Sequence, residues 1–358
     1  MKSVNRIDYL DSIRGLAALS VLIFHCISNH WGYRTDAKIS FLIFNGSDAV
    51  SLFFVLSGLV LTLNILRTSE NLTYSSYQKF MIKRLFRIYP AYIFCLIIYY
   101  IYACKDHSIT EAINNTLTNK TYFLQELVLI RENHNLYLPG WSLGIEIALS
   151  AFLPLLVLLF KYDKKLFTAF AIASLILNKH YISIFTVHFC LGIFIAFYYR
   201  QIENYNFKTS KWYTYRWLIY ILIFIFYNFR HLLELSGSNN GYDVMAAFLY
   251  LDEFHFSGIG AAGILIFCIH HKNIQEILSA RPLVFLGKIS YSIYLTHWFF
   301  ISLLLENWNY FYPFFNNEFH LMLFFTITTL TATLTASVLL YQYIEKPMII
   351  MGKKMANR

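Results

Sequence analysis

Ten apolar runs, most of them close to twenty residues long, constrain this sequence more than any other feature. An α-helix needs about twenty apolar residues to cross a bilayer, and a β-barrel strand alternates with period two instead. Only 14% of the residues are charged, against about a quarter in soluble domains. We therefore predict an all-α fold, a polytopic membrane helical bundle of about ten transmembrane helices in a single domain, 1–358. The predicted spans are 10–30, 48–66, 86–104, 139–160, 164–179, 181–199, 212–229, 254–271, 283–305 and 320–343.

Lysine and arginine predict the orientation of these spans. If the N-terminus is cytoplasmic, the cytoplasmic loops hold roughly three times as many of them as the opposite loops. Both termini are then cytoplasmic, and the basic start without a small-residue cleavage site predicts an uncleaved first span. The outer loops 105–138 and 230–253 are the predicted lids of an outward-facing acceptor site, and TYFLQELVLI in the first is a predicted interfacial helix.

Cysteines and known short motifs give no sign of a metal or nucleotide site. The five cysteines fall within or beside apolar runs without a CxxC spacing, so we expect buried thiols and no metal. No GxGxxG, Walker loop, GxSxG or HExxH occurs. In a membrane chain the distribution of charge matters more than the net charge of +9, so no nucleic acid partner is predicted.

The first span carries two ionisable residues, Arg14 and His25. A step of eleven residues returns to nearly the same helix face, roughly 16 Å further along. Such residues are costly in hydrocarbon, and by default they indicate function. The structural alternative for His25 is an interhelical hydrogen bond.

Depth estimates bring other ionisable residues to the level of His25. At ~1.5 Å per residue, His25 and His297 lie about 20 Å from the cytoplasmic side, and Glu146 about 10 Å from the outer side. Ser57 falls a little deeper. A histidine and a carboxylate at one depth suggest a general base with an orienting partner. The alternative for Glu146 is a structural pair with an arginine.

Arg84 and Arg87 lie three residues apart at the expected cytoplasmic entry of the third span, on one helix face. With Arg14 they form a candidate phosphate pocket, because arginine binds phosphate in a bidentate way. The alternative is the ordinary excess of cationic residues at cytoplasmic helix ends. His188 is interpreted as a packing or minor pocket residue, and His270 and His271 as interfacial.

Several segments together resemble the acyltransferase-3 family, integral-membrane acyltransferases that include O-antigen and exopolysaccharide O-acetylases. The segments are RIDYLDSIRGLAALSVLIFH with Arg14 and His25; SLFFVLSGLVL with Phe53, Phe54, Ser57 and Gly58; KRLFRIYPAY with Arg84, Arg87 and Pro90; WSLGIEIALSAFLPLL with Trp141, Ser142 and Glu146; FLGKISYSIYLTHW with Gly287, Ser290, Tyr291, Tyr294 and His297; and the closing YIEKP. They occur in order over nearly the whole chain. Departures are Leu59, where the family often has phenylalanine, and Ile147-Ala148, which replace a more aromatic pair.

The resemblance implies transfer of an acyl group, most commonly acetyl, from acetyl-CoA (acyl-CoA) to a hydroxyl of a cell-envelope or surface polysaccharide sugar. It implies His25 and Glu146 as catalytic and Arg14, Arg84 and Arg87 as donor-binding. Ser57, Trp141, Ser142, Tyr291 and His297 are implied as supporting. The expected partners are acyl-CoA, a free or lipid-linked envelope glycan and the lipid bilayer, with no permanently bound cofactor. The expected location is the bacterial inner (plasma) membrane, without the extra C-terminal domain of some relatives.

Two other function classes stay open on the residues alone. Intramembrane Arg, His and Glu also suit a proton-coupled secondary transporter of a small solute, although such transporters often show repeated halves that this sequence lacks. A lipid-scaffold protein without chemistry leaves His25 and Glu146 unexplained.

Overall fold

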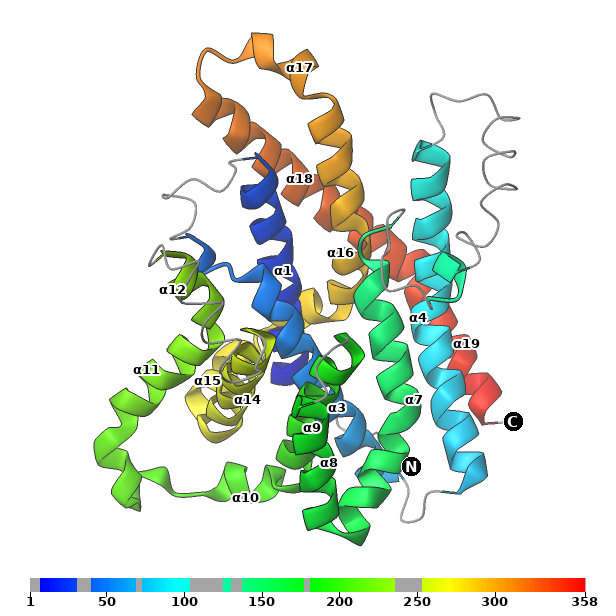
Figure 1. Ribbon diagram of the computed structural model, residues 1–358. Helices are drawn as coiled ribbons and strands as arrows, with labels where there is room; N and C mark the ends of the chain where they lie inside the picture. Colours follow the sequence, from blue (N-terminus) through cyan, green and yellow to red (C-terminus); the bar gives the residue numbers. More distant parts are fainter. Residues whose placement is uncertain are drawn as a thin grey trace. The chain divides into compact units, whose positions relative to one another are not determined.

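The computed structural model describes residues 7–30, 40–68, 73–103, 125–129, 137–176, 181–235 and 253–357. Within these ranges the regular structure is helical and no strand occurs (Figure 1), which confirms the all-α prediction. The helices are α1 (Asp8–His30), α3 (Gly46–Thr68), α4 (Tyr74–Ala103), α7 (Gly140–Tyr162), α8 (Lys164–Ile176), α9 (Tyr181–Phe197), α10 (Tyr199–Asn204), α11 (Arg216–Tyr227), α12 (Phe229–Leu235), α14 (Glu253–His270), α15 (Lys272–Leu278), α16 (Arg281–Glu306), α17 (Trp308–Phe311), α18 (Glu318–Leu340) and α19 (Lys346–Ala356). A π-helical turn, Tyr341–Glu345, joins α18 to α19.

Every predicted span overlaps one of these helices, but the count of about ten spans is not confirmed. Among the described residues, five helices are long and apolar enough to cross a membrane, or six if α14 and α15, bent by 97°, form one span. Helices α8, α9 and α11 have 13, 17 and 12 residues, fewer than the usual length of a span. Helix α16 has 26 residues but carries polar side chains along its length.

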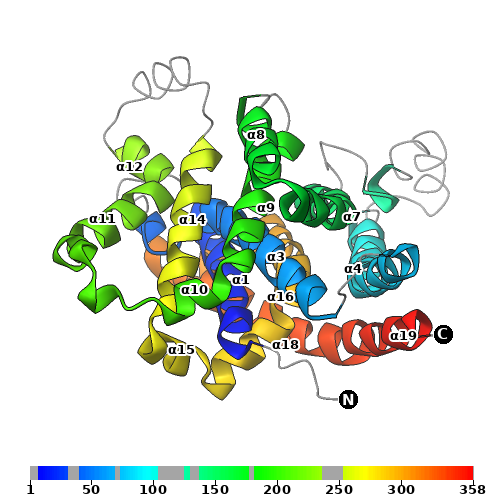
Figure 2. The same cartoon turned by 90° about the horizontal axis from the view of Figure 1, so that it is seen from below.

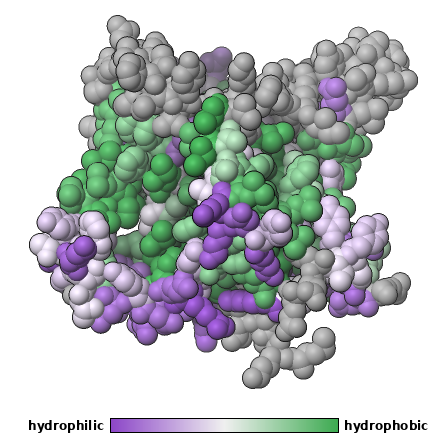
Figure 3. All heavy atoms as spheres, turned by 60° about the horizontal axis from the view of Figure 1, so that its bottom comes forward, coloured by the Kyte–Doolittle hydropathy of each residue, from purple (hydrophilic) through white to green (hydrophobic). Residues whose placement is uncertain are grey.

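The apolar character of these helices is visible on the surface as well as in the core. On the face drawn in Figure 3, large areas are covered by apolar side chains, and hydrophilic side chains gather apart from them. Phe152, Leu155 and Leu158 are exposed along one side of α7. Exposed large apolar side chains in such number suit contact with lipid, so the chain is a membrane protein.

The helices group into two compact units, each discontinuous in sequence. The first unit comprises Met1–Leu72 and Leu149–Lys288, and the second comprises Thr73–Ala148 and Ile289–Arg358. The chain passes from one unit to the other three times, between residues 72 and 73, within α7 and within α16. A single domain over 1–358 stays a prediction.

In the first unit, α3 packs against α1, α9 and α14, as the views in Figures 1 and 2 show from two sides. Sixteen of its residues are buried. The backbones of α3 and α9 approach closely where Gly192 faces Val55 and Leu59. Small residues at such crossings let helix backbones come together without clashes, and this is a common basis of packing in membranes.

Replacing Gly192 by alanine is expected to lower the stability of the protein by about 1–3 kcal/mol, the usual cost of overpacking. An added Cβ would lie 2.6 Å from the backbone nitrogen of Leu59, and backbone cannot yield as a side chain can. Gly263→Ala is the matched control, because its Cβ would meet only the flexible side chain of Ile223. Thermal unfolding in detergent measures both; equal losses for the two variants would contradict the close-approach argument.

In the second unit, α4 packs against α19, and an aromatic core joins α4, α7 and α16. Tyr92 and Tyr137 are fully buried in this core, with ring centroids 5.9 Å apart. The hydroxyl of Tyr137 donates to the backbone carbonyl of Leu295. Burial raises the pKa of Tyr137 well above its ordinary value, so this hydroxyl stays protonated and keeps its role as a donor.

The sequence also makes predictions about the cysteines, the two lid loops and the interfacial helix. Four cysteines, Cys26, Cys95, Cys190 and Cys268, are buried thiols outside any disulfide, as predicted, while Cys104 lies outside the described residues. Most of the two predicted lid loops also lies outside them, as does half of the predicted interfacial helix.

Candidate active site

Arg14 and His25 lie on the same continuous helix, α1. Because this helix is unbroken, the two residues lie on nearly the same helix face, as their spacing predicts. His25 lies near the carboxyl end of α1 and is half-buried, and its ring centroid is 5.3 Å from that of Phe24. Its backbone carbonyl accepts a hydrogen bond of 2.8 Å from Asn29, so the turn that carries His25 is held locally.

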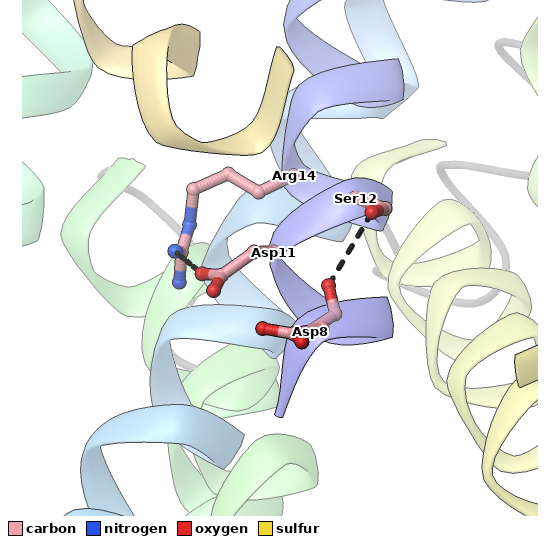
Figure 4. Close-up of polar contacts among 4 residues, drawn as sticks. All are labelled: Asp8, Asp11, Ser12 and Arg14. Carbon is pink, nitrogen blue, oxygen red and sulfur yellow. Dashed lines mark hydrogen bonds and ion pairs between the residues drawn. The ribbon is translucent and has the colours of Figure 1, made fainter. Parts of the chain in front are cut away.

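Arg14 has a carboxylate partner that sequence reasoning missed. Its guanidinium lies 3.2 Å from the carboxylate of Asp11, one turn earlier on α1, and the two side chains point toward each other in Figure 4. The exposed fractions of the two side chains are 14% and 10%. The signal was present in the sequence, because residues three apart on a helix are neighbours.

Arg84 on α4 and Glu146 on α7 form the closest ion pair among the described residues. The distance from Arg84 Nη2 to Glu146 Oε1 is 2.6 Å, and the exposed fractions of the side chains are 11% and 25%. Charge-assisted bonds of this length are strong, and the partial burial limits screening by solvent. The arginine partner considered as the alternative for Glu146 is therefore present, and it is one of the three arginines expected to bind phosphate.

This ion pair contradicts the depth estimates for its two members. The sequence places Arg84 at the cytoplasmic end of its span and Glu146 in the outer half of the bilayer. The expected separation is wrong because α4 begins at Tyr74, not near residue 86, which puts Arg84 about 15 Å inside the helix. Glu146 lies about 9 Å from the start of α7, so the two residues meet inside the packed part of both helices.

Arg87 follows Arg84 by three residues on α4 and is half-buried. Among the residues that the structure describes, Arg84 pairs with a carboxylate and Arg87 does not. Of the three arginines of the predicted phosphate pocket, Arg84 and Arg87 therefore differ in whether a carboxylate already compensates the positive charge.

Supporting residues of the second unit are joined by hydrogen bonds. The hydroxyl oxygens of Ser142 and Tyr294 lie 2.6 Å apart. His297 Nδ1 lies 2.7 Å from the backbone carbonyl of Tyr294. A carbonyl only accepts, so Nδ1 carries a proton, and in the neutral imidazole Nε2 is then the acceptor nitrogen. The Ser142–Tyr294 contact links α7 to α16 beside the Arg84–Glu146 pair, since Ser142 lies one turn before Glu146 on α7.

Tyr291 and Trp141 complete the predicted set in this unit. The hydroxyl of Tyr291 donates to the backbone carbonyl of Ile88 over 2.7 Å, and this bond uses its single proton. Trp141 is half-buried at the start of α7. Ser57, in the first unit, is 8% exposed on α3.

The structure thus brings together Arg84 with Glu146 and Ser142 with Tyr294. His25, Arg14 and Ser57 belong to the first unit, while Glu146 belongs to the second. The contact between His25 and Glu146, and the joint pocket of Arg14 with Arg84 and Arg87, stay predictions.

His188, His270 and His271 each lie within hydrogen-bond distance of a partner. His188 is fully buried, and its Nδ1 lies 2.9 Å from the carbonyl of Ile184, consistent with a packing role. His270 and His271 lie at the end of α14 and bond to Tyr205 and Tyr220. Within the described ranges, no three His, Cys, Asp or Glu side chains gather as a metal site would require.

Comparisons with known proteins identify the family. The profile of the acyltransferase-3 family, described as an acyltransferase domain, matches residues 7–341. Proteins of Staphylococcus aureus strains COL, MSSA476 and MRSA252, each named "Putative O-acetyltransferase", are 25% identical over 338 residues. Each match covers 84% of this chain and 52% of the relative, so the chain spans about half the length of these relatives.

No solved structure matches the chain. The family profile covers nearly all of the described helices, from α1 through α18, and includes every residue of the candidate site. The chain therefore belongs to the acyltransferase-3 family.

Proposed function

We propose that this protein is a membrane O-acyltransferase that moves an acetyl group from acetyl-CoA to a sugar hydroxyl of a cell-envelope or surface polysaccharide. The observation that carries the proposal is a half-buried histidine, His25, on a membrane-suited helix of a chain whose family profile is that of an acyltransferase domain. The relatives named as O-acetyltransferases support acetyl as the group transferred. Membership in this family favours an enzyme over a transporter.

In the proposed reaction His25 is the general base. The sugar hydroxyl oxygen attacks the thioester carbonyl of acetyl-CoA while the imidazole takes the hydroxyl proton. The tetrahedral intermediate then collapses, the carbon–sulfur bond breaks, and the leaving thiolate receives that proton from the imidazolium. The products are the sugar ester and CoA with its thiol. His25 returns to its neutral form, so no further proton donor or acceptor is needed.

Hydroxyl groups are the proposed donors to the oxyanion of the intermediate. Ser57 and Ser142 are the proposed candidates, whereas the single proton of Tyr291 is already donated to the backbone carbonyl of Ile88. One well-placed donor in a site that excludes water contributes about 2.7–4 kcal/mol to the barrier. The hydroxyl oxygens of Ser142 and Tyr294 lie 2.6 Å apart, and Ser142 keeps its proton for the oxyanion when the Tyr294 hydroxyl is the donor of this bond.

The ion pairs sharpen the proposed roles of the arginines. Because Arg84 is held by Glu146 and Arg14 by Asp11, we propose Arg87 as the principal ligand of the donor phosphates. Arg84 and Glu146 then act as a fixed pair that holds α4 against α7 beside this ligand. The acceptor is proposed to be an envelope glycan, free or lipid-linked, and both termini are proposed to be cytoplasmic in the bacterial inner membrane.

Arg87→Ala is expected to raise the KM for acetyl-CoA about 10- to 100-fold, the equivalent of one charge-assisted hydrogen bond, with a smaller change in kcat. Arg87→Lys is expected to recover part of the loss, because lysine keeps the charge but not the bidentate geometry. The exposed Lys83 on the same helix provides the control, and Lys83→Ala is expected to leave the donor KM unchanged. A wild-type KM for acetyl-CoA in Arg87→Ala would show that Arg87 does not bind the donor.

The function itself is tested by mass spectrometry of envelope glycans from cells with and without the gene. Transfer of acetyl adds one ester per modified hydroxyl, which mild base removes. We expect this ester in cells that carry the wild-type gene and its absence in cells that lack it. Identical glycans in both strains would contradict the proposed acceptor class.

A further inference from the structure

A buried polar cluster, separate from the residues discussed above, lies where α3 begins. It consists of Asn45, Ser47, Asp48, Asn228 and His231, and we call it the Asn45 cluster. Four of its members, all except Ser47, are at most 3% exposed. Its contacts join segments more than 180 residues apart in the chain. A polar group in an apolar interior is costly unless it is bonded, so such a cluster needs an explanation.

Asn45 is the centre of this cluster. Its Nδ2 donates to Asp48 Oδ2 over 2.7 Å and to Asn228 Oδ1 over 3.0 Å. Its Oδ1 accepts from the backbone nitrogen of Asp48 over 3.0 Å, a cap of the α3 N-terminus. Because a backbone N–H can only donate, this contact fixes which end of the amide is oxygen.

The direction of the amide also fixes the proton of His231. His231 Nε2 lies 3.0 Å from Asn45 Oδ1 and 3.2 Å from the hydroxyl of Ser47. Since the amide oxygen only accepts, Nε2 must carry a proton and donate. Capping explains the bond from Asn45 to Asp48, but it does not explain why a buried histidine from α12 donates to the same oxygen.

The ring of His231 also reaches the end of α1 that carries His25. Its centroid lies 6.0 Å from that of Phe24 and 5.7 Å from that of Phe41, and these two phenylalanine rings lie 4.8 Å apart. Gly46, the residue after Asn45, packs directly on Phe24, because a Cβ there would lie 2.7 Å from Phe24 Cγ. The Asn45 cluster and Phe24 are therefore in one packed group, and Phe24 immediately precedes His25.

We propose that His231 is a positioning residue for His25. Its hydrogen bond to Asn45 fixes the orientation of the imidazole, the imidazole and Gly46 fix Phe24, and Phe24 sets the turn of α1 from which His25 projects. The catalytic consequence rests on the proposed function, in which His25 is the base. The effect of His231 on the position of His25 does not rest on the proposed function, because the contacts exist whatever the role of His25.

Two substitutions test the hydrogen bond and the packing of His231. His231→Phe keeps a ring but loses the donor, whereas His231→Gln keeps a donor that can reach Asn45. If a shift of the order of 1 Å follows at His25, His231→Phe is expected to lower kcat about 10- to 100-fold with the KM for acetyl-CoA unchanged. His231→Gln is expected to retain kcat within about threefold of wild type.

A second readout depends on geometry alone. The rate at which diethyl pyrocarbonate modifies His25, followed by mass spectrometry, is expected to change several-fold in His231→Phe and to stay near the wild-type rate in His231→Gln. His271→Phe is the matched control, because it removes a similar bond, to Tyr220, in the same unit. His271 lies about 20 Å along α14 from Phe256, which stacks on Phe229 next to the cluster. Neither readout is expected to change in this control.

An unchanged modification rate in His231→Phe, or an equal change in His271→Phe, would overturn the proposal. A changed rate together with a wild-type enzyme that transfers no acetyl would count against the proposed function alone. If His231→Phe is unfolded on size-exclusion chromatography, Phe24→Leu tests the same contact from α1. It is expected to change the modification rate of His25, and an unchanged rate would again overturn the proposal.

Discussion

Replacing His25 by alanine is expected to lower the rate of acetyl transfer about 10²- to 10⁴-fold, the usual contribution of a general base. The KM for acetyl-CoA is expected to stay close to the wild-type value, because the imidazole acts on the hydroxyl proton and not on the donor phosphates. Initial rates with labelled acetyl-CoA and purified protein in detergent measure both quantities. The effect is large because no other group in the proposed reaction is assigned this proton.

His320→Ala is the control for this substitution. His320 is exposed on α18, and its replacement is expected to leave the rate within about threefold of wild type, as for surface changes in general. A His25→Ala protein that folds and keeps more than a tenth of the wild-type rate would show that His25 is not the base.

Breaking the Arg84–Glu146 pair is expected to give the largest loss of stability among the substitutions considered. Arg84→Met leaves the Glu146 carboxylate 75% covered and without its arginine, and removing one partner of a fully buried pair costs roughly 3–5 kcal/mol. The exposed quarter of Glu146 reduces this cost, so we expect about 2–3 kcal/mol, near the lower limit for such pairs. Thermal unfolding in detergent, followed by intrinsic fluorescence, measures the loss.

The double variant Arg84→Met with Glu146→Leu tests whether the loss of stability comes from leaving one charge of the pair without its partner. Apolar residues of similar volume often replace a buried ion pair without net loss, so the double variant is expected to be more stable than either single variant. Lys83→Met, at the exposed neighbouring position, is expected to cost less than about 0.5 kcal/mol. Additive losses from the two single changes would mean that the residues do not stabilise each other.

Hydropathy and helical spacing predict much of the fold. Each predicted span overlaps a helix, and α7 differs from its predicted range by only one residue at the start and two at the end. The face shared by Arg14 and His25 follows from helical geometry alone. The number of spans is not predicted as well, because an apolar run of 12 or 13 residues, as in α8 and α11, indicates a helix without indicating that it crosses a bilayer.

The position of Arg84 shows why depth is harder to predict than helix location. The residues before it, YSSYQKFMIK, are polar enough to end an apolar run but not to end a helix, so hydropathy predicts a start of α4 that is too late. Polar residues are tolerated in helices that extend beyond the apolar region, and hydropathy does not detect them. Because this boundary is wrong, the sequence does not identify Arg84 as the partner of Glu146.

The Asn45 cluster shows a second limit. Asn45 and Asp48 have the spacing of a helix cap, which is visible in the sequence. Their bonds to Asn228 and His231 join α3 to the junction of α11 and α12, and neither periodicity nor spacing predicts a contact between segments so far apart. Such contacts depend on tertiary packing, and in this chain they determine which histidine lies behind Phe24.

The central claim, that this protein transfers an acetyl group from acetyl-CoA to a glycan hydroxyl, is tested most directly in sealed membrane vesicles that contain the protein and are given labelled acetyl-CoA. The account predicts label in base-labile linkage on a glycan, in wild-type vesicles and not in vesicles with His25→Ala. Accumulation of an unmodified labelled solute inside the vesicles, with no label on any glycan and no effect of His25→Ala, would contradict it and favour a transporter.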